Sequence, residues 1–246
     1  MSTNIDMHIS GSGKIPFGEY NKISVCGSGR LIGQVRCVSF FCSGSSKGED
    51  IECASDFIIS GAGRFSGNIT AASVTASGAL HCDGELVASK CFSSSGSVKC
   101  GKGIKCEKLS VSGSLAVEGG IEAEIAKISG SINCKGLLNA ESTEIRFDGG
   151  MTIGSMGGSK IVIAPSKTHK VLRRIPFWGA VVKSAARGVT VNSSVEGDEV
   201  ALEYVTSPRV TGRTVTVGQG CNIALVQYSE TVDISPDAKV GRTEKI

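Results

Sequence analysis

Residues 61–77 read GAGRFSGNITAASVTAS, and the same pattern of glycine, small and apolar residues returns along much of the chain. The glycine that opens this stretch has counterparts seventeen residues away in both directions, with one step of eighteen. The series is Gly27, Gly44, Gly61, Gly78, Gly96, Gly113 and Gly130. A sustained fixed period is typical of proteins built from stacked repeats, so the sequence predicts a solenoid.

Apolar residues within each repeat come in pairs two apart, as Ile69 with Ala71 and Val74 with Ala76. A period of two is that of a strand whose alternate side chains point inward. Three such pairs per repeat predict three short strands per coil, with about 4.8 Å between successive coils. Glycine and serine recur too often for helices to form between them.

We therefore predict an all-β fold, a parallel β-helix of triangular section with about 17 residues per coil. The repeating glycines are expected at corners, where they can adopt positive φ and present no side chain to the bend. The extra residue before Gly96 predicts a β-bulge. We expect a flexible lead with an imperfect first coil at residues 1–22, followed by the main β-helix at 23–163. A basic aromatic insertion is expected at 164–188, further β-helical coils at 189–234 and a mobile tail at 235–246.

Aromatic residues make up only 5% of the chain, which suits a narrow core of aliphatic and small residues with little room for rings. None of the ten cysteines has CxxC spacing and histidines number three, which argues against a zinc site. Most cysteines fall on inward positions, where a thiol behaves as a small hydrophobe, and Cys82 and Cys100 are expected to stack in adjacent coils. No signal peptide or apolar span is recognised, which predicts a cytoplasmic protein.

The unit apolar-x-Gly-x-apolar-x-small resembles the repeat of the bactofilins, the bacterial polymer-forming cytoskeletal proteins. It occurs at residues 31–37, 65–71, 82–88 and 117–123, and residues 195–203 and 217–223 are similar to segments of longer members. The resemblance implies a right-handed β-helix that polymerises end to end without nucleotide in the cytoplasm, often at the inner face of the cell membrane. Its implied partners are further copies of itself, a related bactofilin, and cell-wall or motility proteins. The 164–188 segment departs from the compact family pattern and is expected to split the helix.

A β-helix ends in open strand edges that can pair with another molecule unless they are capped. We hypothesise that the end coils meet head-to-head and tail-to-tail. The candidate interface residues are Ile15, Phe17 and Tyr20 near one end and Val226, Tyr228, Val232 and Ile234 near the other. The alternative is that the lead and the tail fold over the ends as caps.

The 164–188 insertion carries six cations and no acidic residue, so it contributes +6 to a net charge of +3 and leaves about −3 for the rest. Cations beside apolar bulk suit a membrane surface, and the candidate contacts are Leu172, Arg173, Arg174, Ile175, Phe177 and Trp178. The alternative is a loop or short helix that packs on the solenoid. One basic loop lacks the wider basic face of nucleic-acid binders, so no nucleic-acid partner is expected.

No catalytic, nucleotide-binding or cofactor motif is found, and the protein is expected not to be an enzyme and to need no cofactor. An acyltransferase of the hexapeptide class would need a six-residue period and a basic imidazole, and His81 has no carboxylate partner evident in the sequence. The leading hypothesis is a nonenzymatic, self-assembling cytoskeletal scaffold that organises cell-shape, wall or motility factors. The alternatives are a β-helix enzyme acting on a sugar or acyl group, and a monomeric binding module.

Overall fold

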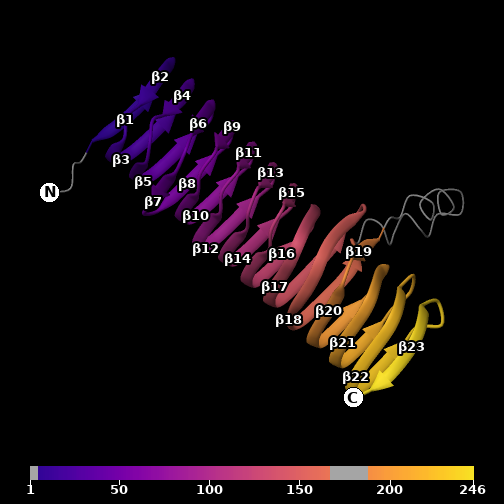
Figure 1. Cartoon of the computed structure of the whole chain (residues 1–246). Coiled ribbons are helices and arrows are strands. Elements are labelled where there is room, and N and C mark those ends of the chain that lie inside the picture. Colours follow the sequence, from indigo (N-terminus) through magenta and orange to yellow (C-terminus); the bar gives the residue numbers. More distant parts are fainter. Residues whose placement is uncertain (1–4, 167–187) are drawn as a thin grey trace, which may run out of the picture. The chain divides into compact units, whose positions relative to one another are not determined.

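The computed structural model describes residues 5–166 and 188–246, and every helix or strand in this part of the chain is a β-strand (Figure 1). The strands form two compact units that divide between Gly119 and Gly120. We call them the N-terminal unit and the C-terminal unit. Within each unit the strands pair in parallel with the strands of the next coil. The predicted parallel β-helix is confirmed.

The strands of the N-terminal unit are β1 (Asp6–Ile9), β2 (Ser12–Ile15), β3 (Gly18–Val25), β4 (Ser28–Leu31), β5 (Val35–Cys42), β6 (Ser45–Gly48), β7 (Ile51–Cys53), β8 (Asp56–Ile59), β9 (Ala62–Phe65), β10 (Ile69–Ala76), β11 (Ala79–Cys82), β12 (Leu86–Ser94), β13 (Ser97–Cys100), β14 (Ile104–Val111) and β15 (Ser114–Val117). Those of the C-terminal unit are β16 (Ile121–Ile128), β17 (Ser131–Phe147), β18 (Met151–Pro165), β19 (Val189–Val191), β20 (Ser194–Leu202), β21 (Val205–Val217), β22 (Asn222–Ile234) and β23 (Lys239–Lys245).

Each coil has three faces, as β9 and β10 illustrate. Strand β9 forms the first, which we call the opening face, and the two halves of β10 form the second and third faces. Within β10 the alternation of buried and exposed residues changes phase at Ala72 and Ser73, which marks the corner between those halves. In-register pairing joins Ile69 to Leu86, seventeen residues on. Coils in the C-terminal unit are shorter in places, since Val200 pairs with Val215.

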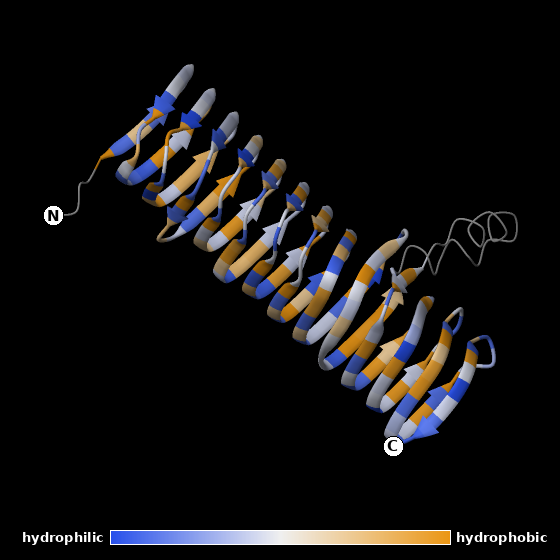
Figure 2. Ribbon diagram, in the orientation of Figure 1, coloured by the Kyte–Doolittle hydropathy of each residue, from blue (hydrophilic) through white to orange (hydrophobic). Residues whose placement is uncertain are grey.

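Inward side chains of successive coils stack in columns, and the apolar positions recur from coil to coil in Figure 2. All the inward residues expected in the 61–77 repeat are buried, namely Phe65, Ile69, Ala71, Val74 and Ala76. The expectation of little room for rings is wrong. Phe40 and Phe57 stack with their ring centroids 5.1 Å apart, and Phe65 meets Phe57 edge-on at 5.4 Å.

Small residues next to these rings provide the space for them. A Cβ atom on either Gly48 or Gly63 would lie 3.3 Å from the ring of Phe65, closer than ordinary packing allows. Ser46, on the same face, is buried as well. Rings therefore fit where neighbouring inward positions carry glycine or serine.

We call the repeating glycines from Gly27 to Gly113 the ladder glycines. They were expected to provide positive φ at corners, but the structure gives another reason for them. None of those six adopts positive φ. Instead, a Cβ atom on Gly61 would overlap the carbonyl oxygen of Gly44, which accepts a 2.8 Å hydrogen bond from the Ala62 N–H group. The same overlap, with the preceding glycine of the column, recurs at Gly27, Gly44, Gly78, Gly96 and Gly113. Close approach of the next coil's backbone therefore explains the period.

The predicted bulge before Gly96 is present in β12. Ala71 pairs with Ala88 but Ser73 pairs with Cys91, so Ser89 and Lys90 together take the place of one residue. The slip moves Cys91 out of the core position that the repeat assigned to it, and Phe92 is buried there instead.

The insertion does not split the solenoid of the C-terminal unit. Met151 pairs with Val189 and Ile161 with Val200, so the coils on the two sides of residues 167–187 remain in register. The chain leaves the coil after Ser166, where the Ser166 N–H group donates to the Phe147 carbonyl at 3.0 Å. Ala164 and Pro165 still belong to β18.

Strands replace part of the expected lead and tail. Met7 of β1 pairs with Ile23, so coils begin before residue 23. Val240 of β23 pairs with Ile223, so residues 239–245 are part of the sheet and not a mobile tail.

Replacing Gly61 by Ala should destabilise the fold by about 1–3 kcal/mol, because the added methyl group displaces the Gly44 carbonyl and strains the pairing of two coils. Thermal and urea unfolding of the full chain would measure the change. Gly149→Ala is the matched control, since no atom lies within 4 Å of a Cβ built there. Equal stability of the two variants would contradict the steric explanation of the period.

Candidate functional site

The described residues hold no cluster of three or more His, Cys, Asp or Glu side chains that could bind a metal ion. Within the same ranges no helix is long and apolar enough to cross a bilayer. The sites that remain to be weighed are the cysteines, the His81 surface and the end coils.

Seven of the ten cysteines are buried and all ten are free thiols, as their inward positions predicted. Cys82 and Cys100 are in-register neighbours in adjacent coils, as expected. The Cys37 and Cys53 sulfur atoms lie 3.4 Å apart, and the contact with Cys37, together with burial, raises the pKa of Cys53 well above its usual value. All four are packed as core residues, and the raised pKa makes the Cys53 thiol a poor nucleophile.

His81 has a carboxylate partner, which the sequence reasoning missed. Its Nε2 atom lies 2.7 Å from the Asp83 carboxylate, two residues further along the chain. Both side chains are close to half exposed. Asp83 follows directly after β11, which ends at Cys82, so a carboxylate two residues from His81 was the available signal.

At the N-terminal end of the solenoid, the outer edges of β1 and β2 have no partner strand among the described residues. β1 pairs with β3 and β2 pairs with β4. The apolar side chains at this edge include Met7 and Ile9, both half-buried, and Ile5, which is exposed. Of the predicted interface residues, Ile15 is fully buried.

The other two predicted residues of this end differ from each other in exposure. Tyr20 is buried and its hydroxyl donates to the Pro16 carbonyl at 2.9 Å, whereas Phe17 is 77% exposed. Phe17 is thus the predicted residue of this end that is available to a partner. Sequence reasoning passed over Met7 and Ile9 because the surrounding residues are polar.

At the C-terminal end, β23 covers only part of the last coil. Its in-register partners in β22 run from Asn222 to Tyr228, so the third-face half of β22, which ends at Ile234, has an open edge. Val232 and Ile234 are half-buried on this half-strand, and Val240 is half-buried on β23. These three side chains and the exposed Ile246 form the apolar surface of this end.

The predicted interface residues of the C-terminal end are thus partly accessible. Val226 is fully buried under the neighbouring coils, while Tyr228 is half-buried. Val240 was missed because KVGRTEK, the sequence of β23, shows too few apolar residues to reveal alternation. The predicted membrane contacts, Leu172 to Trp178, lie outside the described residues.

One curated protein shows a similarity to part of the chain. A 79-residue segment is 29% identical to the "Uncharacterized protein YhbF" of Bacillus subtilis (strain 168), and the alignment covers 32% of this chain. The matched segment is also 32% of that relative, so the chain spans about a third of its length. No family model and no solved structure matches the chain. The resemblance to bactofilins therefore stays a prediction.

Alkylation at pH 8 should modify Cys26 first, because it is the exposed cysteine of the ten. Burial raises the pKa of the Cys134 thiol to about 11 and that of the Cys221 thiol to about 11, so few thiolates form at these two sites. Mass spectrometry of iodoacetamide-treated protein would give the order of labelling, with Cys26→Ser as control. Labelling of Cys134 as fast as Cys26 in the folded protein would contradict the packing described above.

Proposed function

We propose that this protein is a nonenzymatic scaffold that assembles end to end into filaments, without a nucleotide, through its two open end coils. The observation that carries the proposal is the pair of open strand edges, each lined by half-buried apolar side chains, with no cap among the described residues. Such edges are templates for pairing with another chain. The resemblance of the repeat to bactofilins supports the same function.

Assembly is head-to-head at one end and tail-to-tail at the other. Each contact then joins two copies of the same surface across a twofold axis, as in most symmetric oligomers. At the N-terminal end Met7 and Ile9 face their counterparts, and at the C-terminal end Val232 and Ile234 do. Alternating these two contacts extends a filament without direction, and losing one of them leaves dimers.

Lysine substitutions at the two ends test this arrangement. Ile9→Lys should stop the head-to-head contact and leave dimers joined at the C-terminal end, and Ile234→Lys should do the reverse, because each buries a charge in an apolar interface. The double variant should be a monomer. Negative-stain microscopy and sedimentation velocity at micromolar protein would distinguish filaments, dimers and monomers.

Val38→Lys is the matched control for these variants, since Val38 is an exposed apolar residue away from both ends and should leave filaments intact. If either single variant were a monomer, the contacts would be head-to-tail and not twofold, because a head-to-tail contact uses both ends of the protein. A wild-type protein that is strictly monomeric at physiological salt would refute assembly itself.

The proposal includes a cytoplasmic location at the inner face of the cell membrane, where the scaffold organises cell-shape, wall or motility factors, alone or together with a related bactofilin. Its membrane contact is the basic aromatic stretch around Phe177 and Trp178. Apolar side chains would enter the acyl boundary while the six cations of the insertion meet anionic lipid.

Flotation with vesicles that contain anionic lipid tests the membrane contact. Phe177→Glu/Trp178→Glu should abolish flotation, because two carboxylates replace the apolar side chains that enter the lipid. The control Val38→Glu/Leu137→Glu adds the same charge at exposed apolar positions of the solenoid and should float like the wild type. Flotation unaffected by the first pair would remove the insertion as the anchor.

A further inference from the structure

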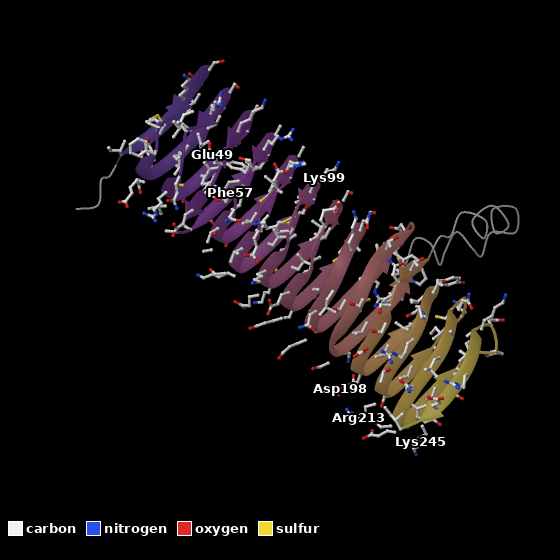
Figure 3. The ribbon with its side chains drawn as sticks, viewed as in Figure 1. Glu49, Phe57, Lys99, Asp198, Arg213 and Lys245 are labelled. Atoms are coloured by element: carbon white, nitrogen blue, oxygen red, sulfur yellow. The ribbon has the colours of Figure 1, made fainter. Side chains whose placement is uncertain are left out.

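The opening face of the N-terminal unit carries a column of basic side chains, one from each of six successive coils. These residues are Lys14, Arg30, Lys47, Arg64, His81 and Lys99 (Figure 3 labels Lys99). Strand register places each one directly beside the next. The column is therefore straight, with about 4.8 Å between neighbouring strands. We call it the cation column.

Most side chains of the column lack the acidic partners that several cations on other faces have. On the second face the signs alternate from Glu19 to Arg36 to Glu52, and Arg36 lies 3.0 Å from Glu52. The opening-face strands of the N-terminal unit contain no acidic residue, and within the described ranges none of the five lysine and arginine side chains of the column forms an ion pair, while His81 Nε2 lies 2.7 Å from the Asp83 carboxylate. Like charges directly opposite each other destabilise a sheet. The lysine and arginine side chains of the column thus repel one another, and no acidic partner in the described structure offsets that cost.

The fold itself does not require cations at these positions. In the C-terminal unit the in-register outward column on the strands that open each coil runs Asn133, Thr152, Thr190, Thr206, Asn222 and Lys239, of which only the last is basic. Neutral residues therefore serve the same structural position. The basic column is a property of the N-terminal unit alone.

A shallow hollow of about 290 Å³ lies along the cation column. Its floor is a parallel column of small residues, Ser45, Ala62, Ala79 and Ser97. At the adjoining corner the residues before the ladder glycines form a third column of exposed hydroxyls, Ser43, Ser60, Ser77 and Ser95. Cations, small residues and hydroxyls thus form three parallel rows over four coils.

This arrangement fits one extended anionic chain that lies along the rows. A B-form duplex carries a charge about every 3.4 Å per strand and winds away from a straight column. Single-stranded nucleic acid binds by stacking on aromatic rings, and the opening-face strands carry no outward Phe, Tyr or Trp. An acidic β-strand would present carboxylates to the column but no side-chain hydroxyl groups to the row of corner serines. No large outward apolar side chain on these strands is available to enter a bilayer.

We propose that the opening face of the N-terminal unit binds an extended anionic polysaccharide that carries one carboxylate per sugar. The carboxylates of such a chain pair with the long lysine and arginine side chains of the column. The sugar hydroxyls lie over the small residues and exchange hydrogen bonds with the corner serines. Binding neutralises the repulsion within the cation column.

Binding of fluorescein-labelled polygalacturonate to the full-length protein, followed by anisotropy at low salt, tests the proposal. Lys47→Gln/Arg64→Gln/Lys99→Gln should weaken binding at least about tenfold, because three charge pairs are lost. Lys90→Gln/Lys105→Gln/Lys127→Gln removes the same charge from exposed lysines outside the column and should change affinity by less than about threefold. The first variant should also melt no lower than the wild type, since it relieves repulsion between like charges.

Competing ligands complete the test. Neutral dextran should not compete, and oligo(dT), poly-glutamate and vesicles with anionic lipid should each compete more weakly than unlabelled polygalacturonate. The proposal is overturned if the wild type does not bind polygalacturonate, or if both triple variants lose affinity equally. It is also overturned if oligo(dT), poly-glutamate or the vesicles bind more tightly than polygalacturonate. A column variant that melts at a lower temperature than the wild type would overturn it as well.

Discussion

The structure depends on a backbone hydrogen bond that only glycine permits. At each repeat, the residue after one ladder glycine donates its N–H group to the carbonyl oxygen of the preceding ladder glycine, as Ala62 does to Gly44 and Ser45 to Gly27, both at 2.8 Å. A side chain on the ladder glycine would occupy the position of that oxygen. Because the bond repeats at one corner, it fixes the register of the strands that follow. Every column on the N-terminal unit, whether of rings, thiols or cations, inherits its straightness from this corner.

The sequence predicted the class of fold because alternation within a strand and the period between coils are both one-dimensional patterns. Residues such as Ile69 and Val74 can therefore be assigned to the core from the sequence alone. The buried Phe40, Phe57 and Phe65 were harder to accommodate, since the space for them depends on which small residues lie beside them in three dimensions. The ladder glycines lie at corners as predicted, but they are needed for the close approach of the next coil's backbone and not for positive φ. A sequence does not distinguish these two reasons for a glycine.

The candidate surfaces were less accessible to sequence reasoning. An end residue is exposed because the next coil is missing, and no local pattern records where coils stop. Ile15 and Val226 have the same alternation as true end residues, yet both are covered. Met7, Ile9 and Val240 lie in short polar strands whose membership in the sheet comes from pairing with Ile23, Val25 and Ile223. The cation column was equally hidden, since its members lie 16 to 18 residues apart and only register aligns them.

The direction of the hydrogen bonds has a mechanical consequence for a protein of this kind. Within each unit the bonds between coils run along the direction in which the coils stack, so a pull along that direction loads them in tension, one coil interface after another. Force applied along the strands would instead shear all the bonds of an interface together, which resists rupture far better. Since each coil contacts only its neighbours, a stretched unit opens from its outermost coil inward. A tether under axial load would therefore lengthen in steps of one coil, and its compliance would be set by its least stable end.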